Sequence, residues 1–178
     1  MLLRRRLPLV ALSVLALGGM LAGCAPDPAP TPSPTPAFAS DEEAFAAAEE
    51  VYRAYNDALN DVDFSSPRTF EGVYSLLTGE MSASTRESFS AFHADGITVT
   101  GRTDYFDLAP ANIRDLRTSV TINVCVDVSS VHVFAATGES LVPPDRPSIQ
   151  PMSVTLKATG GDLRIATLEP AAEVSCER

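Results

Sequence analysis

Residues 118–130 read Thr-Ser-Val-Thr-Ile-Asn-Val-Cys-Val-Asp-Val-Ser-Ser, and this stretch decides the fold. Each second residue from Val120 to Val128 is a branched aliphatic residue, and the residues between them are polar or cysteine. This alternation predicts a long β-strand with one buried and one polar face, because neighbouring side chains of a strand point to opposite sides. Cys125 falls on the polar face of that strand.

Shorter segments alternate in the same way and predict further strands over 97–100, 103–108, 131–136, 152–159 and 162–168. Gly138 marks a turn after one of them, and Gly160-Gly161 marks a hairpin between the last two. We therefore expect an antiparallel sheet in the second half of the chain.

The residues before this sheet follow a helical period. Apolar residues at steps of three and four predict a first helix with one apolar stripe: Phe45, Ala48, Tyr52, Tyr55, Leu59 and Val62. Ser40 and Glu43 predict a capping box at its start. A second helix is expected over 66–79, begun by Ser-Pro and stopped by glycine, and a third over 81–96. The side chains that the second helix turns inward are Phe70, Val73, Tyr74 and Leu77.

Helices followed by an antiparallel sheet define an α+β class, with N-terminal helices packed on a curved antiparallel sheet. This order resembles the NTF2-like (cystatin-related) cone. The resemblance sharpens at Val-Cys-Val-Asp-Val-Ser-Ser over 124–130, at Gly-Gly-Asp-Leu-Arg-Ile-Ala over 160–166, and at Cys176. Small secreted lipoproteins of Gram-positive bacteria are similar in these features, although Leu163 stands where they often have tryptophan. The resemblance implies a concave sheet that holds ligands or partners, and some relatives are isomerases or dehydratases.

The N-terminus has the layout of an export signal. Three arginines within residues 1–6 precede an uncharged stretch over 7–22, and Leu-Ala-Gly-Cys over 21–24 resembles the bacterial lipobox. We expect cleavage between Gly23 and Cys24. We also expect two or more acyl chains, such as palmitate, on Cys24, because several chains together anchor a protein stably. Two alternatives stay open, a retained transmembrane helix and an ordinary signal peptide with an incidental cysteine. The uncharged stretch is shorter than the roughly 20 apolar residues that a spanning helix needs.

The sequence therefore divides into a lipoprotein signal peptide over 1–23, a lipidated cysteine with a proline-rich linker over 24–39, and a single α+β domain over 40–178. Proline at every second position from 26 to 36 favours an extended polyproline II spacer. We expect the domain to stand outside the cell membrane, lipid-anchored on its extracellular side.

Two cysteines remain once Cys24 is acylated, and the exported location is oxidising enough for them to pair. We expect a disulfide between Cys125 and Cys176, with the C-terminal tail lying across the polar face of the long strand. A metal site is the competing interpretation, but His93 and His132 are the only histidines and lack zinc-site spacing. No metal and no cofactor is predicted.

Charge excludes some partners. Removing residues 1–23 takes three of the 13 basic residues and none of the 23 acidic ones, so the formal net charge goes from −10 to −13. A chain this acidic is repelled by phosphate backbones and anionic headgroups, so nucleic acid is not an expected partner. The expected membrane attachment is the lipid on Cys24, and an envelope protein or a small molecule is the possible further partner.

No catalytic residue is assigned. Asp104 and Asp107 with the tyrosines at 52, 55 and 74 are candidates for acid–base chemistry, but the carboxylates are more typical of solvated strand residues. The histidines are expected at the surface, and the serines at 129–130 and 82–88 lack a partner base in sequence. Asparagine and aspartate at 56, 60, 61 and 63 do not have calcium-loop spacing and are interpreted as a solvated helix end.

Three classes of function stay open. A non-catalytic binding or accessory module of the cell envelope is the favoured one, because no nucleophile, base and oxyanion donor can be assembled from the sequence. The alternatives are a small-molecule enzyme of the isomerase or dehydratase kind and a structural envelope protein. A deep pocket with convergent polar groups would favour an enzyme, and a filled cone would favour a structural role.

Overall fold

The computed structural model describes residues 35–159 and 161–177, so the expectations for the signal peptide, for Gly23 and Cys24, and for most of the linker lie outside the described residues. The elements in chain order are α1 (Asp41–Asn60), a 3-10 turn (Pro67–Thr69), α2 (Phe70–Ser75), α3 (Gly79–Ala94), β1 (Thr98–Thr100), β2 (Asp104–Arg114), β3 (Ser119–Asp127), β4 (His132–Phe134), β5 (Ile149–Thr159) and β6 (Asp162–Pro170). No helix in this part of the chain is long and apolar enough to cross a membrane.

The strands form two antiparallel sheets. The larger has the order β2-β3-β5-β6, and the smaller pairs β1 with β4. The alternating stretch from Ser119 to Asp127 becomes β3, a central strand whose residues Val120, Ile122 and Val124 are fully buried. The alternation of buried and polar residues along it is confirmed.

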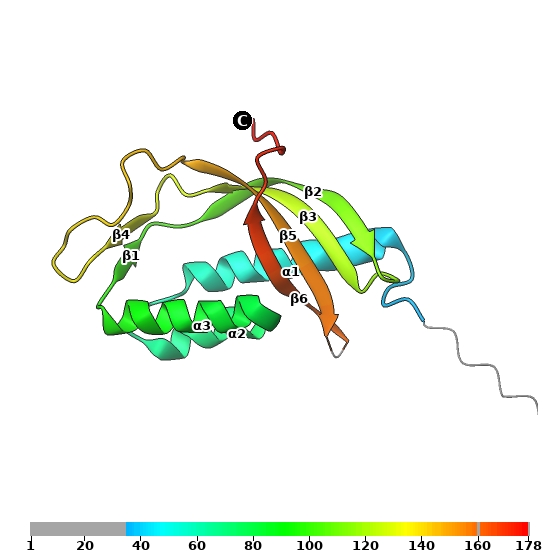
Figure 1. Ribbon diagram of the computed structural model, residues 1–178, viewed down its shortest axis with the longest axis horizontal. Helices are drawn as coiled ribbons and strands as arrows, with labels where there is room; N and C mark the ends of the chain where they lie inside the picture. The colour runs from blue at the N-terminus through cyan, green and yellow to red at the C-terminus, as the bar shows by residue number, and fades with distance from the viewer. Residues whose placement is uncertain (1–34, 160, 178) are drawn as a thin grey trace, which may run out of the picture. The chain divides into compact units, whose positions relative to one another are not determined.

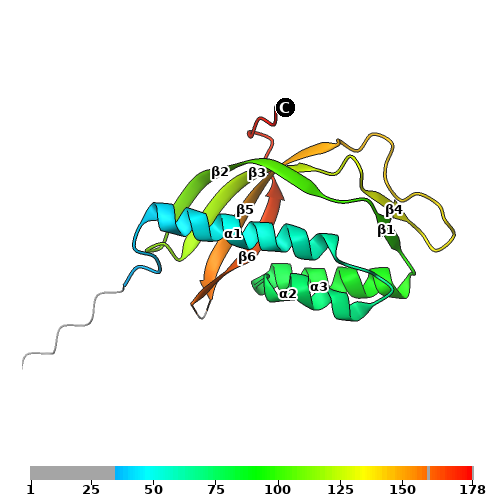
Figure 2. The same cartoon turned by 180° about the vertical axis from the view of Figure 1, so that it is seen from behind.

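All three helices lie on one face of the larger sheet, and the C-terminal tail ends on the other face (Figures 1 and 2). Buried side chains of both layers form one core, which contains Tyr52 and Val73 from the helices and Ile122 and Ile165 from the sheet. The predicted α+β class, with N-terminal helices on a curved antiparallel sheet, is confirmed, and the arrangement fits the NTF2-like cone.

Helix α1 begins as predicted. The Oγ of Ser40 accepts a hydrogen bond from the Glu43 amide at 3.1 Å, and the Glu43 carboxylate accepts one from the Ala39 amide at 2.8 Å. The most buried row of the helix is Ala44, Ala48, Tyr52 and Asn56. This row shares Ala48 and Tyr52 with the predicted stripe. The other members of the stripe are partly buried and pack against the core: Phe45, Tyr55, Leu59 and Val62.

The second predicted helix is shorter than expected. It ends at Ser75, and Gly79 begins α3 instead of stopping the second helix. The reason is a tertiary contact: the Ile165 amide donates to the Leu76 carbonyl at 2.9 Å, and the Thr78 amide donates to the Ile165 carbonyl at 2.9 Å. The segment between α2 and α3 thus leaves the helix to pair with the edge of β6.

Strand β2 is longer than predicted and runs to Arg114 through Pro110. It is an edge strand with two register irregularities, and Asp107 in it has a φ of 50°. Proline is tolerated on an edge, and irregularities there prevent pairing with another chain.

The predicted disulfide is present in the structure. Cys125 and Cys176 are bonded with their Cα atoms 5.7 Å apart. Cys125 points to the face opposite the helices, where it is nevertheless fully buried, and the tail is also held by a hydrogen bond from the Ala171 amide to the Pro151 carbonyl. Because Pro151 stands opposite Cys125 in the sheet, the disulfide and the hydrogen bond both hold the tail against the same part of strands β3 and β5.

At the other end of the domain, the start of the described chain is fixed to the turn between β2 and β3. The Ala37 amide donates to the Leu116 carbonyl at 3.0 Å, and the Arg117 guanidinium donates to the Asp41 carboxylate at 2.7 Å. Asp115, Leu116 and Arg117 all have positive φ values, from 54° to 63°.

Candidate functional site

The candidate site lies where α1 ends, beside α3 and β1. A cavity of about 220 Å³ opens here, lined mainly by apolar side chains: Leu59, Asn60, Val62, Phe64, Phe89, Phe92, Val99, Gly101, Thr103 and Val131. Phe92 and Val99 are 39% and 37% exposed, so they form the mouth of the cavity. No residue of this lining, all of which is described, is ionisable.

The one amide in the lining is already occupied. The Asn60 side chain donates to the Thr103 carbonyl and accepts from the Thr103 amide, both at 2.8 Å. The cavity is therefore a mostly apolar recess whose most polar side chain supports the wall.

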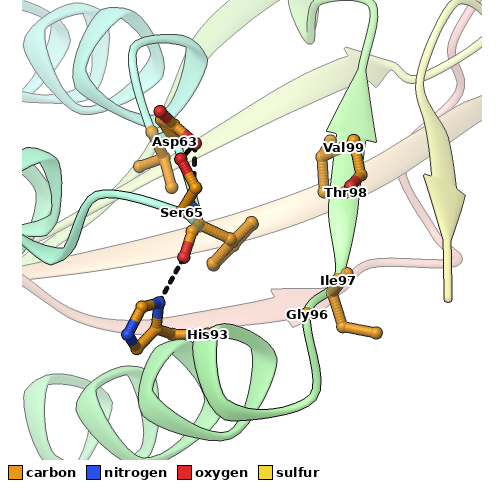
Figure 3. A pocket seen from close by; sticks show the side chains of 9 residues that line it. Asp63, Ser65, His93, Gly96, Ile97, Thr98 and Val99 are labelled. Atoms are coloured by element: carbon orange, nitrogen blue, oxygen red, sulfur yellow. Dashed lines mark hydrogen bonds between the residues drawn. The ribbon is translucent and has the colours of Figure 1, made fainter. Parts of the chain in front are cut away.

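A wider, open groove of about 460 Å³ adjoins the cavity and shares Val62, Phe64 and Val99 with it. Figure 3 shows Asp63, Ser65 and His93 along one wall and residues 96–99 along the other.

Both polar groups on the first wall are held in place. The Nδ1 of His93 lies 2.6 Å from the Phe64 carbonyl oxygen. A carbonyl oxygen only accepts, so Nδ1 carries the proton and donates. The Asp63 carboxylate accepts from the hydroxyl of Ser65 at 2.7 Å and from its amide at 2.9 Å. These hydrogen bonds, first the one from the hydroxyl and then the one from the amide, lower the pKa of Asp63, which is therefore a carboxylate anion at neutral pH.

Deeper in the cone lies a group of tyrosines. The ring of Tyr52 meets that of Tyr105 edge-on at 5.1 Å and that of Tyr55 at 6.1 Å between centroids. Burial, followed by the charge interactions with Tyr55 and Tyr105, raises the pKa of Tyr52, and burial raises the pKa of Tyr55. Both hydroxyls therefore stay protonated at neutral pH, and each can donate one hydrogen bond as well as accept one.

Asn56 shares this interior side of α1 and is only 6% exposed. Within the described residues, its side-chain amide has no hydrogen-bond partner. No fully enclosed side-chain nitrogen or oxygen among those residues lacks a partner, so the Asn56 amide keeps contact with solvent. An unpaired amide next to protonated tyrosines could bind a polar group of a small ligand.

The structure does not bring the candidate carboxylates into the cone. Asp104 and Asp107 are exposed on β2, and Asp104 stands opposite Asp127 in the register, on the face away from the helices. Asn123 lies on the same outer face, so neither it nor Asp127 approaches the tyrosines of α1. The interpretation of Asp104 and Asp107 as solvated strand residues agrees with these positions.

The other candidates lie apart from one another. Tyr74 packs in the core under the guanidinium of Arg86, 4.0 Å from the ring centroid. His93 is exposed but lines the groove, whereas His132 is exposed on β4 and stacks on Phe134. In residues 35–159 and 161–177, no cluster of three His, Cys, Asp or Glu side chains could hold a metal ion.

The interpretation of Asn56, Asn60, Asp61 and Asp63 as a solvated helix end agrees with the exposed positions of the two aspartates but is wrong for the two asparagines. Asn56 is buried, Asn60 joins α1 to the chain before β2, and Asp63 forms part of the groove. The sequence contained a signal for the first two, since Tyr52, Asn56 and Asn60 recur at steps of four and share one helix face. Asparagines that continue a buried row are candidates for interior hydrogen bonding.

Comparisons with known proteins give distant likenesses of shape only. No family model matches the chain, and no curated protein matches it. A proposed aromatic ring hydroxylase from Novosphingobium aromaticivorans superposes with a TM-score of 0.49 at 11% identity, over 75% of this chain and 97% of that one. Aln2 from a Streptomyces species has a TM-score of 0.41 at 20% identity, over 74% and 92%. A proposed polyketide cyclase from Xanthomonas campestris has a TM-score of 0.37 at 14% identity, over 69% and 90%.

Proposed function

We propose that this chain is a lipid-anchored protein on the outer side of the cell membrane that binds a partner molecule at the open end of its cone without catalysing a reaction. The proposed localisation rests on the sequence alone, which has a basic start, an uncharged stretch and Leu-Ala-Gly-Cys ending at Cys24. The lipid on Cys24 attaches the protein, and the linker up to residue 39 separates the domain from the membrane.

The observation that carries the binding role is the chemistry of the cavity wall. General acid–base catalysis needs a side chain that can take or give a proton within hydrogen-bond reach of the substrate. The cavity is lined by aliphatic and aromatic groups, its amide is engaged with Thr103, and none of its described lining residues titrates. Such a recess can hold an apolar group but has no side chain to transfer a proton.

Size points the same way. Small-molecule sites usually occupy about 300–1,000 Å³. The cavity of about 220 Å³ lies below that range, so it suits one apolar group of a larger partner better than a whole small molecule.

A small-molecule enzyme is the second candidate. The observation that favours it is an interior group formed by Tyr52, Tyr55, Asn56 and Tyr105, where the hydroxyls of Tyr52 and Tyr55 and the unpaired amide of Asn56 could polarise a carbonyl. A base would still have to come from the substrate or from water.

The test is site-specific photo-crosslinking of the full-length protein in its own membranes. A photoreactive residue replaces Phe92 at the mouth of the cavity, and the matched control replaces Leu116, which is 49% exposed at the opposite end of α1. We expect a defined adduct from position 92 and none from position 116. Equal labelling at both positions, or none at position 92, would count against the binding role. Turnover of a co-purified small molecule that is lost in Tyr52→Phe would establish the second candidate.

A further inference from the structure

We infer that the partner is an extended peptide that adds as a strand to the free edge of β1, places one apolar side chain in the cavity, and presents a basic residue to Asp63. This inference rests on the proposed binding function and specifies its partner. Three independent features support it: the backbone of β1, the shape shared by groove and cavity, and the charge of the groove.

The first feature is an unpaired backbone edge. The Leu141 amide donates to the Val133 carbonyl at 2.8 Å, so the backbone groups of Val133 point away from β1. Backbone groups alternate along a strand, so those of His132 and Phe134 point toward β1 and pair with Thr100 and Thr98.

The amide and carbonyl of Val99 must then point to the other side of β1. Within the described residues nothing bonds to them. Val99 lines the groove, so this donor and acceptor are available to a strand lying there.

The second feature is the connection between groove and cavity. A peptide residue placed opposite Val99 would project its side chain on the same face as Val99, as directly opposed residues of antiparallel strands do. Val99 lines the groove and the cavity, so that side chain would reach the recess next to Phe64 and Phe92. The recess has the size for one large apolar side chain, which would fix the register of the peptide.

The third feature is charge. Asp63 is fully exposed on the wall across from β1, and its hydrogen bonds from Ser65 keep it ionised. Among the described residues that line the groove, the only other titratable side chain is that of His93. With a formal net charge of −10 for the whole sequence, the protein attracts basic rather than acidic segments.

The test uses the full-length lipoprotein in nanodiscs and fluorescence anisotropy. The probe is a fluorescein-labelled peptide of sequence Thr-Lys-Thr-Phe-Thr-Lys-Thr, with a second peptide in which glutamine replaces both lysines. Val99→Pro removes the outward N–H and replaces the side chain without breaking the pairing of β1 with β4, because proline is tolerated where the N–H of an edge strand faces solvent. Val99→Ala keeps that N–H and is its matched control. Asp63→Asn removes the charge while keeping an oxygen for Ser65.

Val99→Pro should weaken binding of both peptides about ten-fold, through loss of a hydrogen bond and an unpaired peptide carbonyl. Val99→Ala also shortens the side chain that lines the cavity but keeps the N–H, so it should weaken binding by no more than about three-fold, and the difference between the two variants reports the N–H. Asp63→Asn should weaken the lysine peptide about two- to five-fold, as for an exposed ion pair, and leave the glutamine peptide unchanged. Circular dichroism and thermal unfolding identify any variant that has lost its fold.

Equal affinity of Val99→Pro and the unmodified protein for both peptides would overturn the inference, as would no binding of either peptide at about 1 mM, which corresponds to a very weak interaction. The crosslink from position 92 separates the two proposals. A defined adduct there with no peptide binding would leave the binding function standing and remove the peptide, whereas absence of both would remove both.

Discussion

Asn60 and Thr103 bind each other through two hydrogen bonds of 2.8 Å, with the asparagine amide facing both backbone groups of the threonine. The side chain thus acts as a neighbouring strand would, donating to a carbonyl and accepting from an amide. It ties the last residue of α1 to the residue before β2 and so supports the wall of the cavity.

Asn60→Ala should lower the free energy of unfolding by about 1–3 kcal/mol, because both backbone groups of Thr103 lose their partner in a partly buried place. Urea denaturation measures the change. Asn112→Ala on β2 removes an exposed amide and should alter stability by less than about 0.5 kcal/mol. Equal effects of the two substitutions would contradict this role of Asn60.

Replacing both Cys125 and Cys176 by alanine should lower the free energy of unfolding by about 4 kcal/mol, since the disulfide closes a loop with a separation of 51 residues. Dithiothreitol should destabilise the unmodified protein to the same extent. Dithiothreitol should have no effect on the double variant. Detection of two free thiols in protein exported by its native host would refute the disulfide.

The pKa of Tyr52 is raised in the folded protein by burial and then by Tyr55 and Tyr105, above the value of about 10 in an unfolded chain. Its contribution to stability is therefore complete below pH 10 and declines as the pH rises above 10, where only the unfolded chain ionises. Tyr52→Phe should change the free energy of unfolding only slightly at pH 8. At pH 11 the free energy of unfolding of the variant should rise by about 1 kcal/mol relative to that of the unmodified protein. Denaturation at both pH values tests this, and parallel profiles would exclude it.

Leu116→Gly should raise the free energy of unfolding by about 0.5–1 kcal/mol. The left-handed conformation destabilises a residue with a side chain by about 1–2 kcal/mol, and glycine relieves this strain. Glycine also loses more backbone entropy on folding, which offsets about 0.5–1 kcal/mol of that gain in stability. Leu116 has a φ of 54°, whereas Leu141, with similar exposure, is not among the residues of positive φ. Leu141→Gly is thus the matched control and should not stabilise the protein.

If Cys24 is acylated as proposed, Cys24→Ala should release the protein from membranes or leave the precursor uncut, because acylation of a lipobox cysteine precedes cleavage. Detergent-phase partitioning of the exported protein measures the anchor. Partitioning that is unchanged in the variant would disprove lipid attachment at Cys24.

The sequence predicted those parts of the fold that depend on local periodicity. The alternation from Ser119 to Asp127 became β3, and Ser40 capped α1, because both follow from neighbouring residues alone. The departure of Leu76–Thr78 from a helix could not be predicted, since it depends on pairing with the distant Ile165. The passage of β2 through Pro110 likewise depends on its place at the edge of the sheet.

The candidate site was less predictable than the fold for the same reason. Asn60 meets Thr103, and His93 meets the Phe64 carbonyl, only after the chain has folded. The free edge of β1 depends on the pairing of Val133 with Leu141 in the following loop. Single-residue patterns carry no information about such partners.

Helix α1 also determines how far the groove stands from the point of entry of the chain. The hydrogen bond from Ala37 to Leu116 fixes that point near the first turn, and the groove begins just after the last turn at Val62. Twenty residues at 1.5 Å each separate the two by about 30 Å. A segment bound in the groove therefore lies about one helix length from the point where the chain enters the domain.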